Sequence, residues 1–120
     1  MRASTRWRCQ RARGLPPARD ARIAVIGSVL MPVLEFGDMT YADGIAWVDR
    51  ALREAVALLQ PGGWLYDLET LAGTFATATM EGKARRLFQL ELIDSFQRAG
   101  LRDVECVYRF RDRAIVRGRA

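Results

Sequence analysis

The chain has 120 residues, 50% of them hydrophobic, which is the size and composition of one globular domain. Its formal charge of +5 comes from the first 22 residues, which hold seven arginines and one acid and leave 12 basic and 13 acidic residues for 23–120. The charge therefore says nothing about the partners of the main part of the chain. No run approaches the roughly 18 consecutive apolar residues that suggest a membrane-spanning helix, so we expect no membrane contact.

Two residue types limit the chemistry. Histidine is absent, which excludes an imidazole base and histidine metal ligands. Cys9 and Cys106 are too few for a thiolate zinc site, which usually needs about four ligands, so we predict no metal site. We expect both thiols to be reduced, as is typical of the cytoplasm, and we predict a cytoplasmic location.

Residues 1–20 form an arginine-rich segment that differs from the rest of the chain. We interpret this segment as a disordered leader, or as sequence upstream of a different true start. A transit peptide and a nucleic-acid-binding arm are the alternatives, the second with Trp7 between Arg6 and Arg8 as a stacking residue. We therefore divide the chain into a leader, 1–20, and a folded part, 21–120.

The first predicted element is a strand from Ile23 to about Leu30, where nearly every position is apolar. A strand that is apolar on both faces is typical of the interior of a parallel sheet covered by helices. A loop then leads to a helix from about Ala42 to Gln60, with Thr40 and Asp43 in a capping pattern. Pro61-Gly62-Gly63 is expected to end this helix and to turn the chain into the next strand.

The second predicted strand runs from Trp64 to Leu68, and a loop rich in glycine and threonine follows it. A helix is predicted over Lys83–Ala99, with apolar residues on one side and Gly100 as its stop. Alternation over Val104–Phe110 predicts a half-buried strand, which turns into a last strand, Ala114–Val116. The order is strand, helix, strand, helix, strand, strand, an α/β fold that ends in an antiparallel hairpin.

Four segments in this order resemble the C-terminal half of a class I S-adenosylmethionine-dependent methyltransferase. RIAVIGSVLMPVL resembles the fourth strand of that fold, and ADGIAWVDRALREAVALLQPGG resembles the helix that leads into its Pro-Gly-Gly turn. GWLYDLE is similar to the fifth strand, and LELIDSFQRAGLRDVECVYRF to the closing helix and the sixth strand. The resemblance covers roughly 21–118 and implies a partial Rossmann-like sheet, methyl transfer and S-adenosylmethionine as the cofactor.

The chain departs from this family where the cofactor binds. The family's glycine-rich GxGxG turn and the acid that holds the ribose belong to an N-terminal half that this sequence lacks. Arg22 also occupies the place of a frequent acid near the start of the fourth strand. The resemblance therefore implies a partial methyltransferase that is inactive alone and needs a cofactor-binding half.

The candidate site residues lie at the carboxyl ends of the first two predicted strands, where parallel α/β sheets bind ligands. Asp67 and Glu69 are two residues apart, so both can point the same way, and either could orient a methyl acceptor or act as a base. The alternative is that both acids are solvated loop residues. The resemblance implies that a cofactor and acceptor pocket is lined by Gly27, Ser28, Leu30 and Met31; the alternative is a satisfied strand-end hydroxyl for Ser28 and a core position for Met31.

The strand over 23–30 has one edge that the full fold would pair with the missing half. We expect this long apolar edge to associate, either with a second copy in a homodimer or with a second methyltransferase half. A non-catalytic, methyltransferase-like binding or dimerisation module is the alternative function. Nucleic acid, bound through the arginine-rich segment, is the weakest of the partners considered.

Overall fold

The computed structural model describes residues 19–73 and 82–120. The predicted leader, 1–20, therefore lies outside the described residues except for Arg19 and Asp20, and so does most of the predicted loop after the second strand. In chain order the elements are β1 (Ala21–Gly27), α2 (Leu30–Phe36), α3 (Tyr41–Val56), β2 (Leu59–Thr70), α4 (Gln89–Arg98), β3 (Arg102–Phe110) and β4 (Arg113–Arg119).

The strands form one mixed sheet in the order β1-β2-β4-β3. β1 and β2 are parallel, because α2 and α3 carry the chain back across the sheet between them. β4 is antiparallel to both of its neighbours and joins β3 in the C-terminal hairpin. This arrangement confirms the predicted α/β fold class and hairpin, with α2 as an additional helix.

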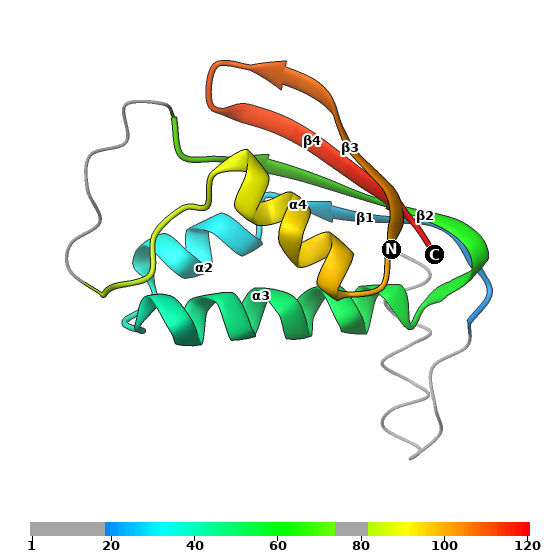
Figure 1. The fold of residues 1–120 in the computed structure, drawn as a ribbon, viewed down its shortest axis with the longest axis horizontal. Coiled ribbons are helices and arrows are strands. Elements are labelled where there is room, and N and C mark those ends of the chain that lie inside the picture. Colours follow the sequence, from blue (N-terminus) through cyan, green and yellow to red (C-terminus); the bar gives the residue numbers. More distant parts are fainter. Residues whose placement is uncertain (1–18, 74–81) are drawn as a thin grey trace.

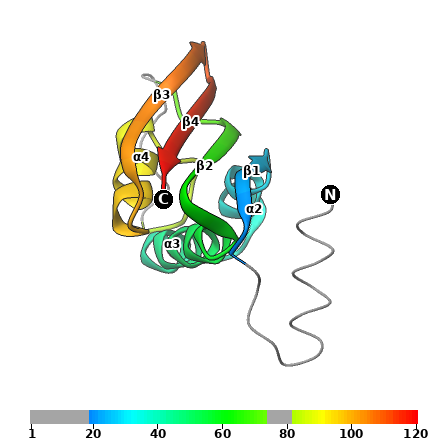
Figure 2. The same cartoon turned by 90° about the vertical axis from the view of Figure 1, so that its right-hand side faces the viewer.

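The three helices of the described chain all lie on one face of the sheet, as Figures 1 and 2 show. The core lies between that face and the helices and is built from large side chains such as Phe96, Met31 and Leu65, which are completely buried. No described helix covers the other face. Ile23 and Val25 of β1 therefore remain 59% and 42% exposed, although the sequence is apolar enough for both faces of this strand to be covered.

The first strand ends earlier than predicted. β1 stops at Gly27, Ser28 has a φ of 51° in the left-handed region, and Leu30 begins α2 instead of ending a strand. Pro32 lies in the first turn of α2, where the N–H that proline lacks would have no partner within the helix. Pro32 is therefore compatible with this short helix, and the prediction that the strand continues to about Leu30 was wrong.

Pro61-Gly62-Gly63 has a different role from the predicted helix stop. α3 ends at Val56, and the three residues lie inside β2. β1 pairs there through Ala21 with Leu59 and through Ile23 with Trp64, so one residue of β1 faces four residues of β2. The segment is thus a bulge, and Gly62 supplies its left-handed conformation with a φ of 82°.

The two predicted helices differ from the observed ones at their ends. Thr40 caps α3 as predicted, because its hydroxyl accepts a hydrogen bond from the Asp43 amide at 3.1 Å. α4 begins at Gln89 and not at Lys83, and the Glu91 side chain accepts a hydrogen bond from the amide of Phe88, the residue before the helix. Residues 83–88 instead run from the start of α3 to the start of α4, and Lys83 forms an isolated β-bridge with Thr40.

Candidate functional site

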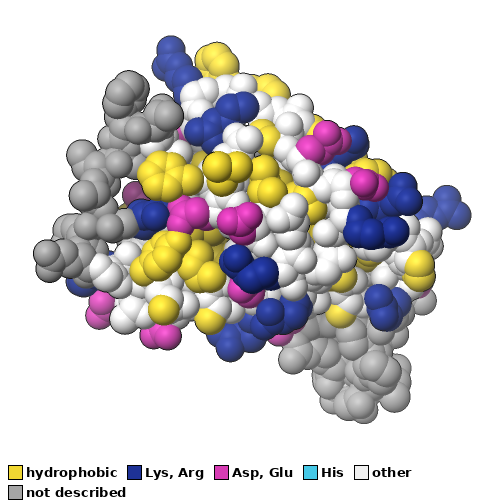
Figure 3. Space-filling view, viewed as in Figure 1, with side chains coloured by type: hydrophobic (Ala, Val, Ile, Leu, Met, Phe, Trp, Pro, Cys, Tyr) yellow, Lys and Arg dark blue, Asp and Glu magenta, His cyan; other side chains and the backbone are white. Residues whose placement is uncertain are grey.

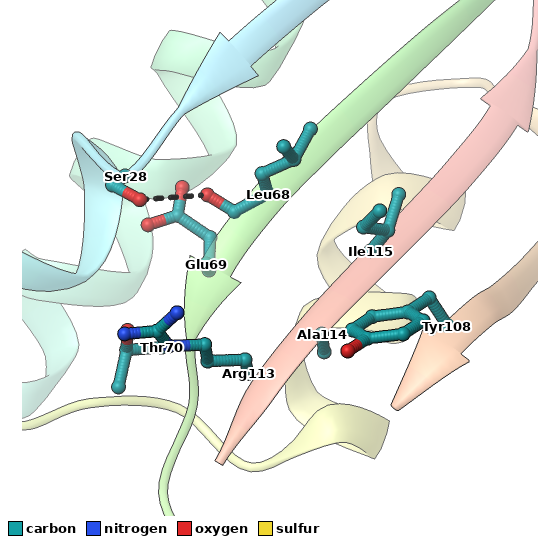
Figure 4. Close-up of a pocket in the computed structure, with 8 residues that line it drawn as sticks. All are labelled: Ser28, Leu68, Glu69, Thr70, Tyr108, Arg113, Ala114 and Ile115. Atoms are coloured by element: carbon teal, nitrogen blue, oxygen red, sulfur yellow. Dashed lines mark hydrogen bonds between the residues drawn. The ribbon is translucent and has the colours of Figure 1, made fainter. Parts of the chain in front are cut away.

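At one edge of the sheet, β1, β2 and β3 end and β4 begins. β1 and β2 end there, because they are parallel, and the antiparallel hairpin turns there between β3 and β4. A hollow of about 400 Å³ lies at this edge. Figure 4 shows the residues that line it: Ser28, Leu68, Glu69, Thr70, Tyr108, Arg113, Ala114 and Ile115.

Glu69 fastens α2 to the end of β2. Its side chain points to the helix-covered face and is only 3% exposed. The two carboxylate oxygens accept hydrogen bonds from the backbone amides of Met31 at 3.1 Å and Leu30 at 3.4 Å. These are amides of the first turn of α2, which have no partner within the helix, so Glu69 satisfies donors that would otherwise be buried and unpaired.

Asp67 lies two residues before Glu69 on the same face of β2, as the spacing predicts, and is completely buried. Neither of its carboxylate oxygens accepts a hydrogen bond from the described residues. Burial raises the pKa of Asp67 well above its ordinary value, and hydrogen bonding to Glu69 and the charge of Glu69 raise it further. A protonated Asp67 can donate a hydrogen bond to Glu69.

The structure separates the six candidates. Ser28 reaches the hollow, and its amide and hydroxyl both donate to the Leu68 carbonyl, at 2.7 Å and 3.4 Å. Glu69 lines the same hollow, whereas Asp67 lies in the core and is not a solvated loop residue. Gly27 ends β1, and Leu30 and Met31 are 2% and 0% exposed beneath the sheet. Ser28 and Glu69 are therefore the two candidates that the fold brings together at this hollow.

Six further lining residues were not predicted, namely Leu68, Thr70, Tyr108, Arg113, Ala114 and Ile115. Four of them come from the C-terminal hairpin, whose strand order places β4 directly beside β2. Thr70 and Arg113 are register partners across that pair. The predicted hairpin signalled that β4 exists, but the sequence does not state that β4 would enter the sheet between β2 and β3.

A second polar cluster joins α3, the segment before α4, and α4 itself. The Arg85 guanidinium lies over the rings of Tyr41 and Phe88, with centroid distances of 5.1 Å and 4.8 Å, and pairs with Glu91 at 2.7 Å. The Tyr41 hydroxyl donates to Glu91 as well. Burial acts to raise the pKa of Glu91, but the hydrogen bonds from Arg85, Tyr41 and the Phe88 amide outweigh it and hold that pKa below its ordinary value.

The described residues do not complete a site for S-adenosylmethionine. An acid that binds a ribose must present a carboxylate to the ligand, whereas Asp67 is fully buried and Glu69 is occupied by two amides. Within 19–73 and 82–120, no glycine-rich turn follows a strand at this edge. Cofactor binding by this chain therefore needs groups that these residues do not supply.

No protein-family model matches the sequence, and neither does any curated protein. Solved structures do match. The chain superposes on an O-methyltransferase family protein from Burkholderia thailandensis with a TM-score of 0.60 and 13% identity, over 90% of this chain and 32% of that one. The chain has the fold of a part of this methyltransferase.

Two further neighbours support this assignment of the fold. One is an S-adenosylmethionine-dependent methyltransferase from Thermotoga maritima, with a TM-score of 0.55 and 18% identity over 94% of this chain and 68% of that one. The other is human N-acetylserotonin methyltransferase in complex with S-adenosylmethionine, with a TM-score of 0.55 and 14% identity over 86% and 30%. The chain thus spans about a third of the length of the Burkholderia and human proteins, consistent with a partial methyltransferase fold.

The surface and the helices bear on the remaining expectations. On the side drawn in Figure 3, basic side chains are interspersed with acidic ones and form no single basic patch. The predicted nucleic-acid-binding arm lies outside the described residues and stays a prediction. In the described part of the chain, no helix has the length and apolar character needed to cross a membrane. The cytoplasmic location also stays a prediction.

Proposed function

We propose that the chain is the acceptor-side portion of an S-adenosylmethionine-dependent methyltransferase, inactive alone and completed by a cofactor-binding half. One observation carries the proposal. The sheet stops at β1, whose outer edge has no partner strand among the described residues, and the chain covers only 68% and 32% of the length of two methyltransferases that it matches.

The exposure of β1 supports the same interpretation. Ile23 and Val25 project from the face without helices, 59% and 42% exposed, on a strand whose outer edge pairs with no strand of 19–73 or 82–120. An apolar edge of this kind is a template for pairing with another strand. A second half that adds strands beside β1 and covers this face would bury both side chains.

The role that we assign to this chain in methyl transfer is to hold the methyl acceptor. Attack on a sulfonium methyl group is promoted mainly by positioning, and the hollow at the carboxyl edge is the place where the acceptor would lie. Of the two candidate acids, Glu69 lines this hollow, and because its carboxylate is bonded to two α2 amides, we assign it the positioning of α2 beside the acceptor. Asp67 would act on Glu69 and not on the substrate, because it is buried behind the strand.

The test is calorimetric titration of the purified chain with S-adenosylmethionine, with light scattering on the same sample. We expect no saturable binding by the chain alone. We expect binding after co-expression with a polypeptide that carries a glycine-rich turn and pairs with β1. Saturable binding by the monomeric chain would contradict the need for a second half.

The alternative is a non-catalytic binding or dimerisation module. The exposed apolar edge of β1 favours it, because that edge can also pair with a second copy of the chain. A stable homodimer that does not bind S-adenosylmethionine, with or without a candidate half, would support this alternative.

A further inference from the structure

The hollow at the carboxyl edge has a floor made of one row of side chains. Ile115 of β4 is the register partner of Leu68 on β2 and of Tyr108 on β3, so these three residues lie side by side across the sheet. All three project from the face without helices, and Leu68 and Tyr108 are 38% and 50% exposed. This row presents a flat apolar and aromatic surface to solvent.

Arg113 lies in the next row toward the edge. It is the register partner of Thr70 on β2 and of Phe110 on β3. In Figure 4 its side chain extends across Thr70 toward the end of β1, where the Ser28 hydroxyl lies. The exposed Arg113 forms no ion pair within 19–73 and 82–120, in contrast to Arg117, which pairs with Glu105 at 2.6 Å.

The other charged group of the hollow is already engaged. The Glu69 carboxylate accepts hydrogen bonds from two α2 amides on the helix-covered side of the sheet. Arg113 is therefore the one lining residue in this hollow whose charge has no described partner. A guanidinium group binds a planar carboxylate through two parallel N–H bonds, and the hydroxyls of Ser28, Thr70 and Tyr108 can add further hydrogen bonds.

We propose that this hollow binds a small molecule that carries a carboxylate on a planar apolar body. Arg113 pairs with the carboxylate, and the planar body lies on the row formed by Leu68, Ile115 and Tyr108. That this molecule is the methyl acceptor rests on the proposed function; that it binds here does not.

The experiment uses benzoate as the probe and benzamide as its neutral analogue of the same shape. Each is titrated into the uniformly ¹⁵N-labelled full-length chain, and amide chemical shifts are followed by NMR. We expect benzoate to shift the amides of 68–70 and 113–115 and to bind about tenfold more tightly than benzamide, because one charge-assisted pair distinguishes them.

Three variants locate the interaction. Arg113→Gln should bring the affinity for benzoate down to that for benzamide, and Arg113→Lys should restore part of the difference. Tyr108→Leu should weaken both ligands, because it removes the ring contact. Arg109→Gln is the control with the same loss of charge: Arg109 lies on neighbouring β3, pairs in register with Ala114, and does not line the hollow.

Equal affinity for benzoate and benzamide would overturn the proposal, as would unchanged benzoate affinity in a folded Arg113→Gln variant. If inorganic phosphate binds as tightly as benzoate, the planar apolar body is not part of what the hollow recognises, and the proposal is overturned. The NMR spectrum of each variant reports directly whether it folds. The titration contains no S-adenosylmethionine, so its failure is separate from a failure of the proposed function.

Discussion

Glu69 accepts hydrogen bonds from the amides of Met31 and Leu30, so a side chain on β2 holds the first turn of α2 against the sheet. Glu69→Gln removes the charge and one accepting oxygen while keeping the size of the side chain. We expect this variant to lose about 1–2 kcal/mol of unfolding free energy in urea titrations, since buried amides lose a charged partner. Amide hydrogen exchange at these two positions should become faster.

Glu35→Gln is the control on the same helix. Its carboxylate is 44% exposed and lies 3.8 Å from the Arg86 guanidinium, a contact of the kind that contributes little in water. We expect its unfolding free energy to stay within about 0.5 kcal/mol of the parent chain. If both variants lose the same stability, the contact between Glu69 and α2 is not what holds that helix.

Asp67 is expected to make the folded chain less stable as pH rises, whereas a carboxylate in an ordinary ion pair makes it less stable as pH falls. Burial and the neighbouring Glu69 raise the pKa of Asp67 in the folded chain, so the folded state keeps a proton that the unfolded state releases. The contribution is fully present below the unfolded pKa of about 3.9 and is lost as pH rises toward the folded pKa. The loss is about 1.4 kcal/mol for each pH unit that separates the two pKa values.

Asp67→Asn should therefore unfold at a higher temperature than the parent chain at pH 7, and the difference should vanish near pH 4. Thermal unfolding from pH 4 to pH 9 measures both. Asp38→Asn is the control, because the Asp38 side chain is 98% exposed and should show neither effect. A variant less stable than the parent chain at pH 7 would show that Asp67 is ionised and has a partner outside the described residues.

Glu91 responds to acid in the usual direction. Burial acts to raise the pKa of Glu91, but Arg85, Tyr41 and the Phe88 amide together lower it, so its stabilising effect is present above the unfolded pKa and lost as pH falls through the folded pKa. Glu91→Gln should cost about 1 kcal/mol at pH 7, a small figure because the cluster is partly exposed to solvent. Asp94→Asn on the same helix is the control. Equal losses at pH 7 and at pH 3 would show that the cluster acts by packing alone.

Gly63 is required by the close approach of two strands in the bulge. A Cβ at this position would lie 2.9 Å from the Ala21 carbonyl oxygen and 3.1 Å from that of Arg22, both of them backbone atoms that cannot turn away. We expect Gly63→Ala to cost about 1–3 kcal/mol of unfolding free energy. At Gly73 a Cβ meets no atom within 4 Å, so Gly73→Ala should leave stability unchanged. A neutral Gly63→Ala would show that the bulge opens easily.

The exposed part of β1 predicts where the chain associates. Val25→Lys should lower the mass measured by light scattering, or weaken binding to a second half, while the unfolding temperature changes little because the side chain is already 42% exposed. Val107→Lys is a matched control at 43% exposure on β3, the opposite edge of the sheet. An equal effect of both substitutions would place the contact elsewhere.

The sequence by itself determined the order and type of the main elements, because these depend on short-range signals. The apolar run after residue 22, the stripe of α3 capped by Thr40 and the alternating strand before the final turn each lie within one segment. The spacing of two residues along one strand was also enough to predict that Asp67 and Glu69 share a face of the sheet. The resemblance of four segments to methyltransferases is consistent with the fold of the solved neighbours.

Only the tertiary structure decided where those elements end and what the candidate residues contact. Pro61-Gly62-Gly63 became a bulge because β1 pairs on both sides of it, and Leu30 began a helix because Glu69, 39 positions away, accepts its amide hydrogen bond. Arg113 joined the hollow because β4 entered the sheet beside β2. These outcomes depend on strand order and on contacts between distant residues, and a local pattern in the sequence contains neither.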